Sequence, residues 1–204
     1  MSLDDKIKNL KYRKKIFKTE YIKVMREKRR KALFDKIRKC EKDAFFLLEG
    51  NPLVLDTFLF DINPITGEKK LDIPDDIIYR IDYTNVDFDN ISARGIDFTG
   101  MLNVHINPQT TFNKDMRDCV LYGTYITGRF DDVYIARTNF TGCEGALIDP
   151  RTIYDKNLNG TILTDAIVVT EFDGVKTNNM SIEAAYLITK EQKDMIYGFQ
   201  KIKE

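Results

Sequence analysis

Apolar residues in the second half of the chain recur every five positions, and a 42-residue internal repeat carries this spacing. Shifting the sequence by 42 residues places Phe98-Thr99-Gly100 on Phe140-Thr141-Gly142 and Phe130-Asp131-Asp132 on Phe172-Asp173-Gly174, without a gap. The apolar stripe consists of Ile91, Ile96, Met101, Ile106, Met116, Leu121, Ile126, Val133, Thr138, Cys143, Ile148, Leu158, Leu163 and Val168, with Thr138 its one polar member. A period of five fits neither the 3.6-residue turn of a helix nor the two-residue alternation of a strand.

A chain that turns a corner every five residues, with one side chain inward on each side, returns to its start after about twenty residues, as stacked solenoids do. Two such circuits of about twenty residues account for the 42-residue repeat under two conditions. One side lacks its inward apolar residue, at Thr111 and Ile153, and one corner carries a two-residue bulge beside Asp131-Asp132. The alternative is an ordinary β-sandwich with turns every eight to twelve residues. Such turns would not keep one register over 42 residues, so we favour the solenoid.

Four consecutive five-residue units begin at Ile81, Val86, Ile91 and Ile96, and the first reads Ile81-Asp82-Tyr83-Thr84-Asn85. They resemble the pentapeptide-repeat family, whose unit is a small or apolar residue, Asp or Asn, Leu or Phe, and two variable residues. The resemblance covers residues 81–180 and implies a mainly-β fold, a right-handed quadrilateral β-helix with first and third positions inward. Ile and Val at the first position, where the family usually has Ala, imply a wider coil.

The remaining residues are expected to cover the two ends of this β-helix. Residues 1–50 are predicted to form a basic α-helical segment, because Leu3 to Glu49 contain no Gly or Pro and keep a narrow apolar stripe. They form either one long helix or, as we favour, a helical pair that folds back at Arg26–Lys31. Residues 51–80 are predicted to form an N-terminal cap and a first imperfect coil, and the apolar run Leu53–Phe60 is either a buried strand or that imperfect coil.

Residues 181–204 are predicted to form a C-terminal helical cap. Ser181 is expected to cap one short helix, and Thr189-Lys190-Glu191-Gln192 has the form of a capping box for a second helix over residues 190–201. The predicted buried face of this cap consists of Leu187, Met195, Ile196 and Phe199. The family resemblance also implies that Ile182–Phe199 is a candidate homodimer contact.

The net charge of zero conceals a strong division of charge along the chain. Residues 1–50 hold 17 Lys and Arg against 8 Asp and Glu, a net of +9, whereas residues 51–204 hold 15 against 24, a net of −9. The basic run has three readings: contact with nucleic acid through residues 11–42, a solvated helix face, or docking on an acidic surface of this or another chain. The candidate partner-binding residues are Arg26, Lys28, Arg29, Arg30, Lys31, Asp87, Asp89, Asp131 and Asp132.

The sequence offers no convincing catalytic, cofactor-binding or metal-binding set. His105 is the only histidine, and Cys40, Cys119 and Cys143 are widely spaced without a Cys-x-x-Cys pair. Buried, reduced thiols favour an intracellular protein, and the absence of an apolar leader or a membrane-length apolar run leads us to expect a cytoplasmic location. No enzyme activity and no cofactor are expected.

The first functional hypothesis is therefore a non-enzymatic interaction protein, with a rigid β-helix that presents faces to a protein partner and a basic end that contacts an acidic partner. Two alternatives remain open. One is a DNA-mimicking protein that binds type II topoisomerases, as the family resemblance implies, and the other is a nucleic-acid-binding protein that acts through the basic helices. Some bacterial effector ubiquitin ligases carry a pentapeptide-like β-helix ahead of their catalytic region; if the chain is an effector of that kind, it is at most the binding portion and acts in the host-cell cytosol.

Overall fold

The computed structural model describes residues 24–39, 46–47 and 57–201, without the side chains of residues 46–47 and 197–201. The chain divides into two compact units, Met1–Ala44 and Phe45–Glu204. The helix predicted before residue 24, the thiol of Cys40 and the side chain of Phe199 lie outside the described residues.

Residues 24–38 of the first unit form one helix that runs through the basic run Arg26–Lys31. The helical pair that we favoured therefore has no break at this point. Arg, Lys and Glu are good helix formers, and Arg30 Nη1 lies 3.9 Å from Glu27 Oε2 one turn earlier. Charge interrupts the apolar stripe here without interrupting the backbone.

The second unit begins with the two-residue strand β1 (Phe46–Leu47), which pairs in parallel with β4 (Ile81–Asp82). The prediction of helix as far as Glu49 is thus wrong at β1. Residues 57–59, predicted as part of a strand, are helical. Leu59 is fully buried in this helical conformation, as the predicted strand would also have required.

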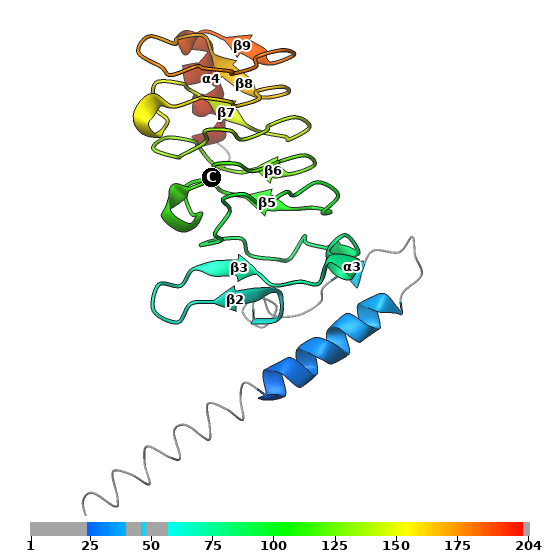
Figure 1. Ribbon diagram of the computed structural model, residues 1–204. Helices are drawn as coiled ribbons and strands as arrows, with labels where there is room; N and C mark the ends of the chain where they lie inside the picture. The colour runs from blue at the N-terminus through cyan, green and yellow to red at the C-terminus, as the bar shows by residue number, and fades with distance from the viewer. Residues whose placement is uncertain (1–23, 40–45, 48–56, 202–204) are drawn as a thin grey trace, which may run out of the picture. The chain divides into compact units, whose positions relative to one another are not determined.

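A short antiparallel hairpin follows, formed by β2 (Phe60–Ile62) and β3 (Lys69–Leu71). Asn63 closes its turn, because its side-chain oxygen accepts the backbone N–H of Ile65 at 2.9 Å. The helix α3 (Asp75–Ile78) starts directly after Pro74 and leads into β4. Figure 1 shows the hairpin and α3 at the beginning of the layered part of the unit.

Beyond β4 the chain lays down successive layers, which Figure 1 shows one above another from β5 to β9. These strands are β5 (His105–Ile106), β6 (Tyr125–Ile126), β7 (Leu147–Ile148), β8 (Ile167–Val169) and β9 (Tyr186–Ile188). All their pairings are parallel, and the paired residues lie 19 or 20 positions apart, as in Ile106 with Ile126 and Val168 with Leu187. Isolated parallel bridges link other sides of the layers, for example Asp97 with Val120 and Val120 with Asn139.

The side chains of the five-residue stripe fill the interior of these layers. Every member is buried except Ile96, which is half-buried, so the predicted inward row is confirmed. The polar member Thr138 is fully buried and donates its hydroxyl to the carbonyl of Met116 at 2.5 Å. Thr111 and Ile153 are also buried, which shows that the side without an apparent anchor does have one.

The predicted fold class, a mainly-β right-handed β-helix of the pentapeptide-repeat type, is wrong. In the described residues the strands are two or three residues long and lie in four separate sheets of two or three strands, none of which closes. Helices at both ends and 3₁₀ turns between the strands make the architecture mixed. The physical reason is that most residues of a layer lie in turns or in segments without regular structure, so few remain to form ladders.

Residues with positive φ mark these turns and recur at the 42-residue spacing of the sequence. Asn90, Asp132 and Gly174 have φ values of 59°, 57° and 72°, and other positions repeat in the same way. Pairs that match over 42 residues include Asn103 and Gly145, Asn113 and Asp155, Lys114 and Lys156, Asp118 and Gly160, and Gly123 and Asp165. The internal repeat therefore has a counterpart in the backbone.

The end of the chain differs from its prediction in one of two elements. The helix α4 (Lys190–Lys201) is present with its capping box, since Thr189 N–H donates to Gln192 Oε1 at 2.8 Å and Gln192 N–H to Thr189 Oγ1 at 3.3 Å. The short helix predicted after Ser181 is instead a further layer that ends in β9. Leu187 and Met195, predicted to be buried, are 51% and 59% exposed.

Candidate functional site

Two 3₁₀ turns that lie 42 residues apart, η1 (Phe112–Lys114) and η2 (Tyr154–Lys156), shape one side of the layered unit. In η2, Asp155 and Lys156 both adopt the left-handed conformation, with φ values of 53° and 46°. This conformation costs an L-residue such as lysine about 1–2 kcal/mol, so the surrounding packing must fix it. The buried side chain of Ile153, directly before the turn, provides that anchor. Tyr154 and Lys156 are consequently held on the surface by a rigid turn.

An aromatic pair lies beside this turn. The rings of Tyr134 and Tyr154 stack with their centroids 3.8 Å apart and an angle of 29° between their planes. Hydrogen bonding to Tyr154 raises the pKa of Tyr134 above its ordinary value. The guanidinium of Arg117 lies 4.9 Å from the centre of the Tyr134 ring, and two bonds to Asp115, of 2.6 and 2.8 Å, fix its orientation.

A groove of about 700 Å³ opens at η2, where Ile153 and Asp155, the chain neighbours of Tyr154, line it. Its lining, which we name the mixed-charge groove, consists of Asp131, Asp132, Arg151, Thr152, Ile153, Asp155, Lys156, Gly174 and Lys176. Three acidic and three basic side chains thus share one concave surface. A groove of both signs suits a partner that carries both signs and gives little attraction to a uniformly charged one.

Several of these charges are already satisfied within the layers. Lys176 Nζ lies 2.6 Å from Asp155 Oδ2, and Arg151 forms an ion pair with Glu171 while its Nε lies 3.6 Å from Asp149 Oδ1. Within the part of the chain that the structure describes, the side chains of Asp132 and Lys156 have no ion-pair partner. The groove therefore offers one free carboxylate and one free ammonium group on backbone positions that the turns hold fixed.

The predicted acidic site residues fall into two unlike groups. Asp131 and Asp132 line the mixed-charge groove as surface residues. Asp87 instead forms an ion pair with the buried Lys69 at 3.0 Å, and Asp89 accepts a hydrogen bond from the hydroxyl of Thr110. Asp87 and Asp89 thus hold neighbouring layers together, and the structure does not bring them to the groove.

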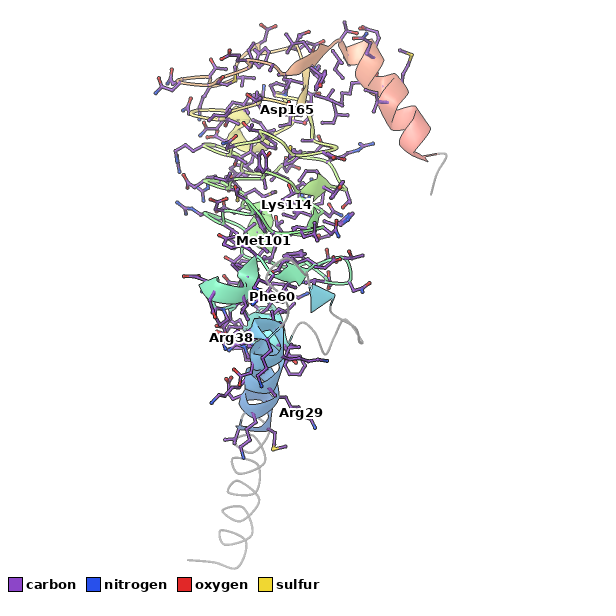
Figure 2. The ribbon with its side chains drawn as sticks, turned by 90° about the vertical axis from the view of Figure 1, so that its right-hand side faces the viewer. Arg29, Arg38, Phe60, Met101, Lys114 and Asp165 are labelled. Atoms are coloured by element: carbon purple, nitrogen blue, oxygen red, sulfur yellow. The ribbon has the colours of Figure 1, made fainter. Side chains whose placement is uncertain are left out.

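The predicted basic residues lie on the helix of residues 24–38. Lys28, Arg29 and Lys31 are exposed, whereas Arg26 and Arg30 are half-buried. The guanidinium of Arg30 lies 5.0 Å from the centre of the Phe34 ring, so part of its surface is used within the helix. Figure 2 shows the side chains of Arg29 and Arg38 extending from this helix.

No cluster of three or more His, Cys, Asp or Glu side chains in the described ranges is placed to hold a metal ion. His105 is exposed and stacks on Tyr125 with ring centroids 4.8 Å apart. Burial raises the pKa of both Cys119 and Cys143 to about 12, which disfavours a thiolate nucleophile. As for helices, none in the described part of the chain is long and apolar enough to cross a bilayer.

Sequence reasoning missed the aromatic pair and the basic side of the groove. The signal that would have found them is the spacing of one layer, since Tyr134 and Tyr154 are 20 residues apart, as are Lys156 and Lys176. The five-residue period identifies inward rows only. Outward-facing side chains that are one layer apart in the sequence also lie side by side, because parallel layers stack their residues in register.

Comparison with protein-family models, curated proteins and solved structures gives no match to this chain.

Proposed function

We propose that the chain is a non-enzymatic protein-interaction module that binds a protein partner through the mixed-charge groove and the adjoining Tyr134–Tyr154 pair. The observation that carries the proposal is the free Asp132 and Lys156 beside stacked tyrosines, on a backbone fixed by left-handed turns. The exposed basic residues of the 24–38 helix provide a second contact, for an acidic partner surface.

The composition of this face supports protein binding over other roles. Tyrosine and arginine are the residue types that contribute most to binding energy in protein interfaces. Side chains on rigid turns lose little conformational entropy when a partner binds, and each immobilised flexible side chain otherwise costs about 0.5–1.5 kcal/mol. The opposite free charges would orient the partner and exclude uniformly charged surfaces.

DNA mimicry is less well supported, because the carboxylates of the layers are largely occupied. Asp118 lies between Arg94, at 3.6 Å, and Arg137, at 2.5 Å. Hydrogen bonding to Arg137 holds the pKa of Asp118 below its ordinary value. A mimic of duplex DNA needs rows of unneutralised negative charge. A DNA-gyrase supercoiling assay decides the question, since a mimic inhibits or protects the enzyme at stoichiometric concentrations.

Nucleic-acid binding through the basic helix remains the second candidate function. Residues 24–39 contain eight Lys and Arg against two Asp and Glu, a net of +6 in sixteen residues. If this helix binds nucleic acid, affinity for a duplex falls by orders of magnitude between low and physiological salt, as counterion release requires. Fluorescence anisotropy with a labelled duplex, for the wild type and for Lys28, Arg29 and Lys31 replaced together by Gln, measures this directly.

The groove is tested by removing its two free charges without changing the backbone preference. The groove variant carries Asp132→Asn and Lys156→Gln together in the full chain. It is compared with wild type in a quantitative pull-down from nuclease-treated lysate of the source cells. The matched control is Asp173→Asn with Lys190→Gln, two exposed charges outside the groove. We expect the groove variant to retain at most about one tenth of the partner that wild type retains, which corresponds to a loss of at least about 1.4 kcal/mol in binding free energy. Equal retention by the groove and control variants would exclude this groove as the contact.

A further inference from the structure

A second groove, of about 680 Å³, lies where α4 approaches the layers. Its lining, which we name the α4 pocket, comes from three layers and the helix: Gly142, Cys143, Glu144, Gly145, Ala146, Asp165, Ile167, Tyr186, Ile188 and Ile196. Figure 2 shows Asp165 among the upper layers of the unit. The volume is within the range of about 300–1,000 Å³ that small-molecule sites occupy.

The helix that forms one wall is held in place by specific contacts. Lys193 Nζ lies 2.5 Å from Asp149 Oδ2, and the side chain of Asp149 is only 2% exposed. The capping box fixes the start of α4 at Thr189. Ile196 faces the pocket three residues beyond Lys193, about one turn along the helix, so the ion pair sets its position.

The floor of the pocket is rigid backbone. Gly145 has a φ of 79°, and a Cβ atom there would lie 2.6 Å from the carbonyl oxygen of Ile126 in the layer below. Gly142, also left-handed, donates its N–H to Asp165 Oδ2 at 2.8 Å. The segment 142–146 can therefore lie flat against its neighbour and leave space above it.

The lining of the α4 pocket is apolar, and its charged side chains are all acidic. The walls are apolar, formed chiefly by Ile167, Ile188, Ile196 and the buried Ala146 and Cys143. The charged side chains among them are carboxylates, Glu144 and Asp165, and no lysine or arginine belongs to the lining in the described residues. Tyr186, which is 63% exposed, adds an aromatic ring at the edge.

We propose that the α4 pocket binds an organic cation with an aliphatic body, such as an alkylammonium group. The three isoleucines would take the hydrocarbon part, since removing CH₂ groups from water is favourable. Glu144 and Asp165 would lie near the ammonium group, and the Tyr186 ring offers a cation–π contact. Anions of the same size are repelled by the two carboxylates. The site is separate from the mixed-charge groove and does not depend on the function proposed for it.

The test uses three probes that share one hydrocarbon chain and differ in charge: n-hexylammonium, n-hexanol and hexanoate. Binding to the full chain is followed by amide NMR, with the signals of Gly142, Gly145 and Ile188 as reporters. We expect saturable shifts with hexylammonium, affinity for hexanol weaker by about tenfold, and no shifts with hexanoate. Equal binding of hexanol and hexylammonium, or the absence of shifts at these amides, would overturn the proposal.

Two sets of variants locate the contact. Glu144→Gln with Asp165→Asn keeps the acceptor for the Gly142 N–H and should lower hexylammonium affinity to that of hexanol. The matched pair Asp173→Asn with Glu183→Gln, exposed acids outside the pocket, should leave it unchanged. Ile196→Ala removes part of the apolar wall from α4 and should weaken both hexylammonium and hexanol. If the control pair weakens hexylammonium as much as the pocket pair, or if Ile196→Ala has no effect on either probe, the site assignment is wrong.

Discussion

Asp and Asn side chains close many of the turns between layers, and they do so as hydrogen-bond acceptors. In each case a side-chain oxygen accepts the backbone N–H two residues later, the bond of an Asx turn. This bond is made, at 2.8 to 3.2 Å, by Asp82, Asp87, Asp97, Asn107, Asp115, Asn139, Asp149 and Asn157. The recurrence of Asp in the sequence thus reflects turn geometry, and the acidic charge of residues 51–204 overstates how acidic the binding surface is.

Asp97 allows the hydrogen-bonding role of an Asx-turn aspartate to be tested apart from its charge. Its side chain is exposed and accepts the N–H of Thr99 at 2.9 Å. Asp97→Asn keeps the acceptor and removes the charge, so we expect a stability within about 0.5 kcal/mol of wild type. Asp97→Ala removes the acceptor and should cost about 0.5–1.5 kcal/mol. Urea unfolding measures both, and a loss as large for Asn as for Ala would show that the charge matters.

Two glycines with similar positive φ values allow the stability cost of close approach between layers to be measured by Gly→Ala substitution. Gly123 has a φ of 77° with open space around its would-be Cβ, whereas Gly145 has a φ of 79° with the Ile126 carbonyl oxygen 2.6 Å away. Gly123→Ala should cost about 1–2 kcal/mol, the strain of the left-handed conformation alone. Gly145→Ala should cost clearly more, because backbone must move. Equal melting temperatures for the two variants would contradict the close approach.

At the scale of elements, a local helix-capping signal correctly predicted α4, whereas a similar signal at Ser181 wrongly predicted a helix before β9. The capping box Thr189–Gln192 acts within four residues, so the sequence alone specifies where α4 begins. Ser181 is an equally good helix cap in isolation, yet its N–H bonds to the carbonyl of Thr161 in the layer below. A parallel pairing with residues about twenty positions earlier overrides a local helix signal, and such a pairing has no local signature.

The ion pair between Lys193 and Asp149 makes stability depend on pH. Burial alone would raise the pKa of Asp149, but hydrogen bonds from Lys193 and the Arg151 N–H, and both positive charges, hold it below its ordinary value. A lowered carboxyl pKa stabilises the fold above the unfolded value of about 3.9, and this contribution is lost as pH falls through the folded pKa. Lys193→Met should therefore cost about 1–3 kcal/mol at neutral pH, because a buried carboxylate loses its donor.

At about pH 3, below the ordinary carboxyl pKa of about 3.9, the Asp149 carboxyl of the unfolded chain is largely protonated, and the variant no longer holds its folded carboxyl charged, so the difference in stability between Lys193→Met and wild type should shrink. Urea unfolding at both pH values is the measurement, with Lys190→Met, an exposed lysine of the same helix, as control. A cost for Lys193→Met that does not change with pH would mean that lost packing, rather than charge, explains it.

Strand β1 is expected to stabilise the layered unit, and deletions that keep or remove it can test this. Phe46 and Leu47 pair with Ile81 and Asp82, although they lie in the segment that the sequence assigns to a basic helix. Removing residues 1–44 keeps this pairing, and removing residues 1–50 exposes the backbone edge of β4. We expect the second deletion to melt at a lower temperature than the first by circular dichroism, and equal melting temperatures would show that β1 adds nothing.

For the whole molecule, the five-residue period correctly identified the buried residues and did not determine the fold class. An inward row requires only that the chain turn at regular intervals, and the turns here use left-handed residues that leave strands of two or three residues. Of the candidate site, Asp131 and Asp132 were predictable as exposed acids on a turn. The basic residues that share the groove with them, Lys156 and Lys176, come from later layers, so only the stacking brings them together.

The buried thiols report on the integrity of the whole layered unit. Cys119 is fully buried and Cys143 is 5% exposed, and both have a pKa raised by burial to about 12. In a Cys40→Ser background, both should resist a thiol reagent at neutral pH and react together when denaturant unfolds the unit. Mass spectrometry of the labelled sites gives the order, and early labelling of Cys143 alone would indicate local opening around the α4 pocket.

The recurrence of left-handed residues every 42 positions constrains how such a chain can change in length. Duplication of one whole repeat would give each new residue the neighbours that its counterpart already has, with every Asn, Asp or Gly still at a turn that needs it. An insertion of one residue within the layers would instead put side chains such as Ile148 or Leu163 where the backbone must turn, and turn residues where the interior must be filled. Descendants of this sequence should therefore differ in length by whole repeats in the layers, and by arbitrary numbers of residues only in the outward loops.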